Sequence, residues 1–312
     1  MKRSFFKVTA IMLAASFILA GCVIKSTSSK NITQKGTAFM WEVSGKAGDG
    51  KLYLLGSIHA GKEDLYPLKP VITDAFEASD VLAVECDVTT VLQRKDYADL
   101  MKKVMYTDGT TIKDHISSDL YDKVDVMLKE HGLSISLLAK YKPFMIASTI
   151  TSYQLIDWGY KPDDGIDISF INLAREQSKE IAEIESVDFQ YDLLGGFSDQ
   201  IQELELRSTV EGIESSKTFM DDMFQYWIEG DVKKFEDLTF QEDPSFSPEE
   251  KAIYKEFEKQ MFDDRNINMA AKAEEYLKSG KTYFFVVGSG HMVGDAGIVN
   301  LLRDKGYTVI QK

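Results

Sequence analysis

Apolar runs of strand length lie at both ends of the chain. The segments "AFMWEVSG" (38–45) and "KLYLLGS" (51–57) alternate or run apolar, and the glycine-rich "GKAGDG" (45–50) separates them, which predicts a β-hairpin. The next two segments predict a helix with Pro70 in its first turn (68–80) and a buried strand, "VLAVECDV" (81–88). The final segment, 281–312, repeats the order of strand, loop, helix and strand.

The middle of the chain has a helical pattern instead. Apolar positions recur with a period of about 3.6 residues in 119–132, 137–159 and 165–179, and a short strand pattern, "EIAEIE", follows at 180–185. Long helices with acidic outer faces are predicted from 189 to 279. Together these patterns predict an α/β fold: a mixed central sheet with βαβ units at both ends of the chain and a large helical insertion between them. No linker interrupts 37–312, so we expect one globular domain.

The N-terminus has the pattern of a secretion signal. Basic residues (Lys2, Arg3 and Lys7) precede an apolar stretch, "VTAIMLAASFILA" (8–20), which is short for a membrane span. It ends in "LAGC" (19–22), which resembles the lipobox of bacterial lipoproteins. The resemblance implies a signal peptide at 1–21, lipidation of Cys22 with a fatty acid such as palmitate, and a polar tether over 22–36. An uncleaved signal anchor is the alternative.

The charge balance narrows the choice of partners. The formal net charge is −14 with a pI near 4.8, and no basic stripe is present, so nucleic acid is not an expected partner. We expect the membrane contact to be made through the lipid anchor, on the extracytoplasmic face of the cell membrane, or in the outer membrane or periplasm if the organism has two membranes. After lipidation Cys86 would be the remaining cysteine, and we expect it to pack as a small apolar residue rather than act as a nucleophile.

Two of the four histidines occur in the same local frame, Gly-Ser-x-His after a strand. These are His59 and His291, and Glu85 and Glu185 likewise follow predicted strands. Ligands of open α/β sheets bind outside the carboxyl ends of parallel strands, so the four side chains can converge if their strands are neighbours. Glycines at 56 and 288 leave the two loops free of a Cβ.

Two imidazoles and a carboxylate are a ligand set for a divalent transition metal, which lowers the pKa of bound water and polarises a carbonyl group. A second carboxylate can then serve as general base. The alternative is that each histidine forms a hydrogen bond in the core and binds nothing. His115 and His131 lack the frame and are expected to be structural or exposed.

Four segments resemble the TraB/PrgY/gumN family, which is related to the Tiki proteins: "GSIHAG", "VLAVECD", "DRNINMAAKAEEYL" and "FFVVGSGHMVGDAGIVNLLRDKGYTV". The pair of Gly-x-x-His motifs is matched by Gly56–His59 and Gly288–His291. The resemblance implies a fold shared with Tiki, erythromycin-esterase-like and ChaN-like proteins. It also implies a metal-dependent peptidase, with manganese or cobalt preferred over zinc.

The resemblance assigns roles by position. The metal ligands are His59, His291 and Glu85; the catalytic candidates are Glu85, Arg265 and Glu185; and the substrate-binding candidates are Asn266, Ser57 and Ser289. Arg265 has an alternative role in a salt bridge with an acid such as Glu85, and Asn266 an alternative role in capping a turn. Asp167 is interpreted as an acid in the first turn of a helix rather than as a ligand.

The function expected from these features is that of a lipid-anchored, extracytoplasmic metallopeptidase that hydrolyses a peptide or pheromone-like peptide with metal-activated water. The alternative is a non-catalytic lipoprotein of the same fold that binds or sequesters a peptide or haem.

Overall fold

The computed structural model describes residues 37–45 and 50–312. Its centre is a six-stranded sheet with the order β4-β3-β5-β2-β1-β6. The predicted hairpin is confirmed: β1 and β2 are antiparallel and flank the glycine-rich segment. β2, β5, β3 and β4 are parallel to one another, whereas β1 also pairs antiparallel with β6, so the predicted mixed sheet is confirmed. The strands are β1 (Met40–Ser44), β2 (Lys51–Ser57), β3 (Val81–Val84), β4 (Glu180–Glu183), β5 (Thr282–Gly288) and β6 (Thr308–Gln311).

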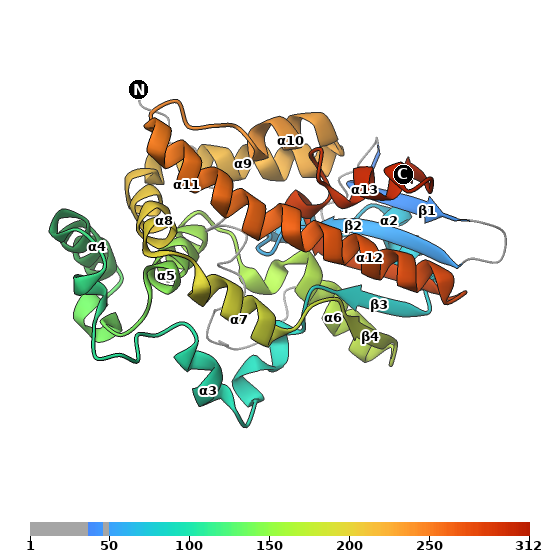
Figure 1. Ribbon diagram of the computed structural model, residues 1–312. Coiled ribbons are helices and arrows are strands. Elements are labelled where there is room, and N and C mark those ends of the chain that lie inside the picture. The colour runs from blue at the N-terminus through green and yellow to red at the C-terminus, as the bar shows by residue number, and fades with distance from the viewer. Residues whose placement is uncertain (1–36, 46–49) are drawn as a thin grey trace.

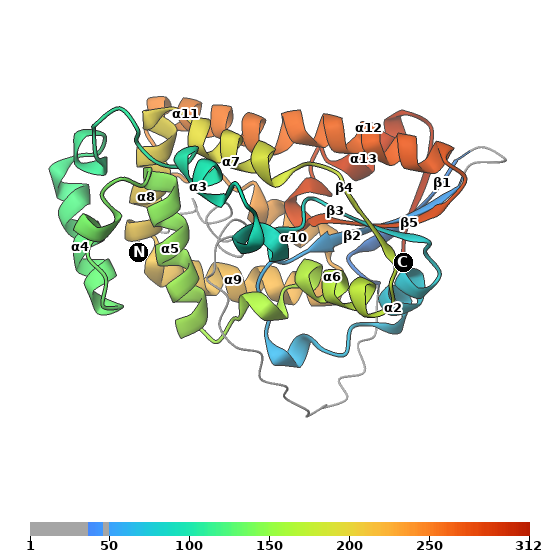
Figure 2. The ribbon, with the colours of Figure 1, turned by 90° about the horizontal axis from the view of Figure 1, so that it is seen from below.

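Helices cover both faces of the sheet (Figure 2). α2 (Pro70–Glu77) and α6 (Ile166–Glu176) lie on one face, and α12 (Asp264–Lys278) and α13 (Ile298–Asp304) lie on the other. The alternation of side chains along β5 explains both contacts. Phe284 packs against Phe76 of α2 and Phe170 of α6, with ring centroids 5.5 and 4.8 Å away. Tyr283 stacks on Tyr276 of α12 at 4.3 Å.

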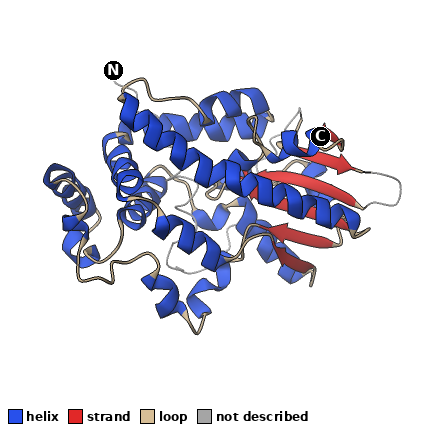
Figure 3. Cartoon of the chain, in the orientation of Figure 1, coloured by secondary structure: helices blue, strands red, loops and turns tan. Residues whose placement is uncertain are grey.

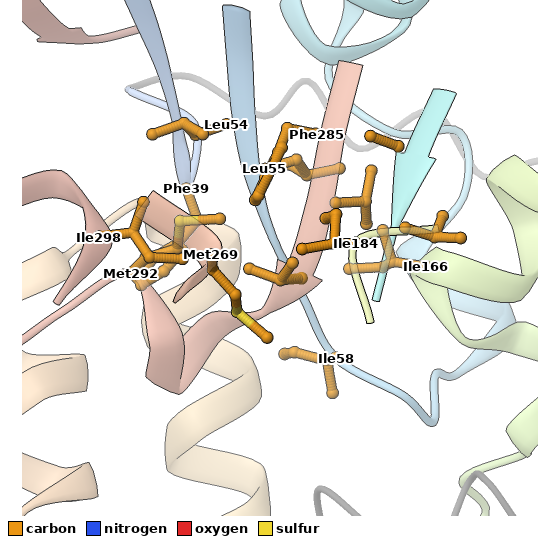
Figure 4. Packing of buried hydrophobic residues seen from close by; sticks show 14 of the residues in the cluster. Phe39, Leu54, Leu55, Ile58, Ile166, Ile184, Met269, Phe285, Met292 and Ile298 are labelled. Atoms are coloured by element: carbon orange, nitrogen blue, oxygen red, sulfur yellow. The ribbon is translucent and has the colours of Figure 1, made fainter. Parts of the chain in front are cut away.

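The core continues from the strands into the loops that follow them. Figure 4 shows Leu55 and Phe285 on neighbouring strands, with Met269 of α12 beside Met292 and Ile298. All of these side chains are buried, and full burial of an apolar side chain of this size is worth about 1.5–3 kcal/mol. The sheet and the loops that carry the histidines therefore share one core.

The predicted helical insertion lies at one end of the sheet (Figures 1 and 3). Within it, α4 packs with α5 and α8 around a second apolar cluster that includes Val124, Ile146 and Leu206. The helices between β3 and β5 other than α6 and α12 are α3 (Tyr97–Lys102), α4 (Ser118–Glu130), α5 (Pro143–Asp157), α7 (Val187–Gly196), α8 (Asp199–Glu211), α9 (Ile213–Glu229), α10 (Val232–Thr239) and α11 (Pro248–Glu258).

Three local expectations differ from the structure. The helix predicted over 137–159 begins only at Pro143, whose ring suits the first turn, and it is buried on several faces rather than amphipathic. Within the long helices predicted from 189 to 279, the segment 198–231 is divided into α8 and α9 at Gly212. Gly56 is expected in the loop, but it lies within β2, where a Cβ would come within 2.7 Å of Phe39 and of the Ser289 hydroxyl.

The predicted signal peptide, Cys22 and the tether lie outside the described residues. Within the part of the chain that the structure describes, no helix has the length and apolar character needed to cross a membrane.

Candidate active site

The carboxyl ends of four neighbouring parallel strands meet at one edge of the sheet. Each delivers one of the predicted residues: Glu185 after β4, Glu85 after β3, His291 after β5 and His59 after β2. Three of these residues, His59, Glu85 and His291, line one cavity together with Arg265. The strand order places the two histidine loops and the Glu85 strand side by side, so the predicted convergence is confirmed for these three residues, whereas Glu185 does not line the cavity.

The two histidine loops are held together by their own serines. The Ser289 hydroxyl donates to the Ser57 carbonyl at 3.0 Å, and the Ser57 hydroxyl donates to Asp167 at 3.1 Å. Both serines are buried, at 3% and 2% exposure for Ser57 and Ser289. This geometry does not support the predicted contact of the two serines with substrate. Instead, their hydroxyl groups hold the histidine loops in place.

His59 is oriented by the start of α6. The Ile166 amide donates to the Ile58 carbonyl at 3.1 Å, which brings the first turn of α6 against the loop. Asp167 in that turn then lies 3.0 Å from His59 Nδ1. The interpretation of Asp167 as a first-turn acid is correct, but it has the further role of holding His59 through Nδ1, which leaves Nε2 for the cavity.

His291 is oriented by α12 in the same way. The Asn266 side-chain nitrogen donates to the Ala296 carbonyl at 3.0 Å, so its oxygen accepts from His291 Nδ1 at 2.6 Å. That arrangement assigns the proton to Nδ1 and leaves a lone pair on Nε2. Asn266 is 1% exposed, so the structure places it behind the histidine rather than at a substrate surface.

Arg265 forms a salt bridge, the role expected from the sequence as the alternative to a catalytic one. Its guanidinium donates to Glu185 at 2.8 Å and to Glu85 at 2.9 Å, and also to the Met261 carbonyl at 3.1 Å. The side chain is 3% exposed, and its remaining donor points at the Met261 sulfur. Because its donors are already used, the geometry favours fixing of the carboxylates over direct contact with a substrate.

The three cavity residues differ in protonation. Burial lowers the pKa of His59, but the Asp167 carboxylate outweighs it and raises this pKa to about 9. Burial and then the Arg265 charge lower the pKa of His291 to about 3. Burial alone would raise the pKa of Glu85, but Arg265 lowers it to about 2. At neutral pH the cavity therefore holds a carboxylate, a neutral imidazole and an imidazolium.

Gly288 forms the base of a cradle between these groups. A Cβ at this position would lie 3.3 Å from Glu85 Oε1, 3.3 Å from His59 Nε2 and 3.6 Å from His291 Cδ2. The glycine therefore leaves open the space on which the three side chains converge. The cavity offers about 30 Å³ to the centres of water-sized molecules, enough for two or three waters.

The types of ligand atom around the cradle suit a divalent transition metal. Two imidazole nitrogens and one carboxylate oxygen are suitable ligands, and His291 Nε2 lies 3.9 Å from Glu85 Oε1. Two ligands about 2.1 Å from one ion are separated by about 3–4 Å, which this pair satisfies. Nevertheless, the described residues contain no group of three or more His, Cys, Asp or Glu side chains already close enough to hold an ion. An ion shared by all three residues would therefore need at least one of these side chains to move.

The structure also identifies a residue that the sequence did not reveal. Gln190 of α7 lines the cavity, and its side-chain nitrogen donates to Glu85 at 3.1 Å and to Glu185 at 3.0 Å. Its oxygen accepts from the buried Cys86 thiol at 3.2 Å. Burial raises the pKa of Cys86 well above its usual range, which disfavours the thiolate and agrees with a packing role.

The other two histidines lie outside this site. His115 stacks on Tyr106 at 4.0 Å, and His131 stacks on Tyr153 at 4.4 Å. Neither lines the cavity, and both are structural, as expected.

The sequence pattern of the TraB/PrgY/gumN family matches residues 39–311, which includes both histidine loops, the Glu85 strand and α12. The chain belongs to this family. The matched range thus contains all six strands of the sheet, from β1 to β6.

Two relatives share similarity over most of their length. Both are described as the uncharacterized protein YbaP, one from Escherichia coli (strain K12) and one from Shigella flexneri. Each is 25% identical over 260 residues, which is 82% of this chain and 89% of the relative. No solved structure matches the chain.

Proposed function

We propose that this chain is a metal-dependent peptidase, anchored by lipid at Cys22 and acting outside the cytoplasm. The observation that supports the proposal best is the geometry around Gly288. There the Nε2 atom of each imidazole is left for a cavity that it shares with Glu85, while its Nδ1 atom is held by another side chain. His291 therefore directs an unprotonated Nε2 at the cradle, whereas His59, an imidazolium at neutral pH, would release its Nε2 proton on binding an ion.

His59, His291 and Glu85 would hold the ion. Manganese or cobalt is preferred over zinc because of the family resemblance. When bound, such an ion lowers the pKa of a coordinated water and polarises the carbonyl of a peptide bond. The residues of the chain prepare this site: Asn266 keeps His291 Nε2 unprotonated, and Arg265 keeps Glu85 ionised.

The carboxylates have separate tasks in this scheme. Both oxygens of Glu185 are occupied by Arg265 and Gln190, so this residue holds the arginine in place rather than serving as a base. Glu85 uses Oε2 for the same partners and directs Oε1 toward the cradle, where it accepts from the Gly288 amide at 2.6 Å. In this proposal Glu85 Oε1 is thus the carboxylate oxygen that would bind the ion or accept a proton from water.

Substrate would reach the site past apolar side chains. Val88, Leu193, Leu194 and Met261 line the cavity together with the charged residues. These surfaces suit an apolar residue next to the scissile bond, and the surrounding low polarity strengthens the electrostatic interactions within the site.

The test is turnover of a fluorogenic peptide library by the full chain in neutral detergent, after chelation and after addition of Mn²⁺ or Co²⁺. We expect cleavage only with metal, and at least a hundredfold loss in His59→Ala and in His291→Ala. His115→Ala and His131→Ala are the matched controls and should retain activity, since both histidines lie outside the cavity. Equal losses in all four variants would refute the proposed site.

The alternative of a peptide-sequestering protein is supported by one finding, the lack of a ready-made group of three ligands among the described residues. It predicts tight peptide binding without cleavage at any metal concentration. A haem is a poor fit to a cavity with about 30 Å³ for water-sized molecules, so peptide is the better occupant within this alternative.

A further inference from the structure

A second hollow adjoins the cavity of the candidate active site: Phe262 and Asn266 line it, and they directly follow Met261 and Arg265 of the first cavity. We call it the acidic groove and define it by Phe240, Glu258, Phe262, Asp263, Asn266 and Asp295, which line it. The volume of the groove that is open to the centres of water-sized molecules is about 520 Å³. This lies within the range of about 300–1,000 Å³ that is typical of ligand sites. It is formed by the end of α10, the α11–α12 junction and the loop that follows His291.

The floor of the acidic groove is aromatic and its rim is anionic. Phe240 and Phe262 meet edge to face, with ring centroids 5.6 Å apart. No described Lys or Arg forms an ion pair with Glu258, Asp263 or Asp295; the ion pairs nearby, such as Lys259–Asp264, use other carboxylates. Lys255 is the cationic side chain that lines the groove. Burial raises the pKa of Glu258 to about 7; the Asp263 and Glu242 charges add to this rise, while a Tyr254 hydrogen bond and the Lys255 charge oppose it.

Two residues that line the acidic groove, Phe262 and Asn266, also contact His291. Phe262 contacts the His291 ring, with centroids 5.4 Å apart, and Asn266 holds its Nδ1 atom at 2.6 Å. Phe262 and Asp263 belong to a π-helical turn, Lys259–Asp263, inserted between α11 and α12. Such turns place side chains that a regular helix would direct elsewhere, and they are frequent at functional sites.

We propose that the acidic groove binds a cationic side chain of a peptide, Arg or Lys, and that its occupancy is felt at His291 through Phe262 and Asn266. The alkyl stem would lie on the two phenylalanine rings while the charge lies among Glu258, Asp263 and Asp295. An aromatic floor with carboxylates that outnumber the one lysine of the lining is complementary to a long cationic side chain and repels an acidic one. The proposal goes beyond the proposed peptidase activity and does not depend on it.

The test is binding of acetyl-Leu-Arg-Leu-amide to the metal-free full chain, measured by calorimetry. The matched ligand is the same peptide with citrulline, which has the shape of arginine without its charge. We expect the citrulline peptide to bind at least tenfold more weakly. Asp263→Asn combined with Asp295→Asn should weaken the arginine peptide roughly three- to tenfold, because exposed ion pairs contribute modestly.

A second pair of substitutions controls for overall charge. Asp122→Asn combined with Glu176→Gln removes the same charge from exposed positions that do not line the groove, and binding should be unchanged. In protein with ¹⁵N-labelled histidine, the peptide should shift the His291 signal and leave those of His115 and His131 in place. Equal binding of both peptides, equal loss in both double variants, or no binding at millimolar peptide would overturn the proposal.

The outcome is separable from that of the peptidase. His59→Ala should still bind the peptide in the acidic groove, because His59 lies in the other cavity. If the peptide binds but no metal-dependent cleavage is observed, the groove proposal holds and the peptidase proposal fails. If cleavage is observed without peptide binding in the groove, the peptidase proposal holds and the groove proposal fails.

Discussion

Replacing Gly288 with alanine tests the cradle without touching a ligand. The backbone at Gly288 has φ −50° and ψ 138°, which alanine adopts without strain. The added Cβ would lie 3.3 Å from both Glu85 Oε1 and His59 Nε2, closer than ordinary van der Waals contact. The methyl group therefore occupies the space between the proposed ligands while every ligand remains present.

The expected effects on stability and on metal affinity differ. Reduced freedom of the unfolded chain stabilises the variant by about 0.4–1 kcal/mol, and crowding in a packed site costs about 1–3 kcal/mol. The net change is therefore at most about 2.5 kcal/mol, and the fold should persist. For the metal, displacing the ligands by a few tenths of an ångström should cost about 10- to 100-fold in affinity, or about 1.4–2.7 kcal/mol.

The full chain is first treated with a chelator to remove bound metal. Its Mn²⁺ affinity is then measured by calorimetric titration, and its stability by thermal unfolding. The matched control is Gly196→Ala, because a Cβ at Gly196 meets nothing within 4 Å. The control should bind Mn²⁺ as the parent does. Unchanged Mn²⁺ affinity in folded Gly288→Ala would refute the cradle as the ion site.

Three further substitutions test the surroundings of the cradle. Asp167→Asn removes the charge that raises the pKa of His59 to about 9, so an NMR titration should give a lower pKa; an unchanged value would contradict the assigned cause. Arg265→Leu leaves two buried carboxylates without their cation and should lower the free energy of unfolding by about 3–5 kcal/mol in urea; a loss below about 1 kcal/mol would show that the ion pairs are dispensable. Burial raises the pKa of Glu205, whose carboxylate has no hydrogen-bond partner among the described residues, well above its ordinary 4.5. Above pH 4.5 the unfolded chain therefore loses this proton before the folded one, and stability falls as pH rises; Glu205→Gln should remove that fall in denaturant titrations between pH 4.5 and 8, and parallel curves would contradict it.

The sheet could be predicted from the sequence because its signals are local. The hairpin, the helix that begins at Pro70 and the strand before Glu85 each have an apolar period and a terminator within a few residues. The repeated Gly-Ser-x-His frame also predicts where the histidines lie relative to their strands. That the strands are neighbours follows only from the order β4-β3-β5-β2, in which β5 pairs with two strands more than 200 residues earlier in the chain.

The partners of the histidines were harder to predict. Asp167 was visible as a helix acid, but its contact with His59 depends on how α6 docks against the β2 loop. Gln190 had no signal at all, since one amide on an amphipathic helix resembles any other polar residue. The choice between salt bridge and substrate contact at Arg265 likewise depends on two carboxylates that are 80 and 180 residues away in sequence.

The central claim is that His59, His291 and Glu85 share one divalent ion, and Mn²⁺ bound to ¹⁵N-histidine-labelled protein tests it most directly. Pulsed electron paramagnetic resonance detects nitrogen nuclei coupled to the bound ion. We predict coupling to two imidazole nitrogens, reduced to one in His59→Ala and in His291→Ala and unchanged in His115→Ala. Bound Mn²⁺ with no imidazole coupling, or coupling unaffected by either site variant, would contradict the account.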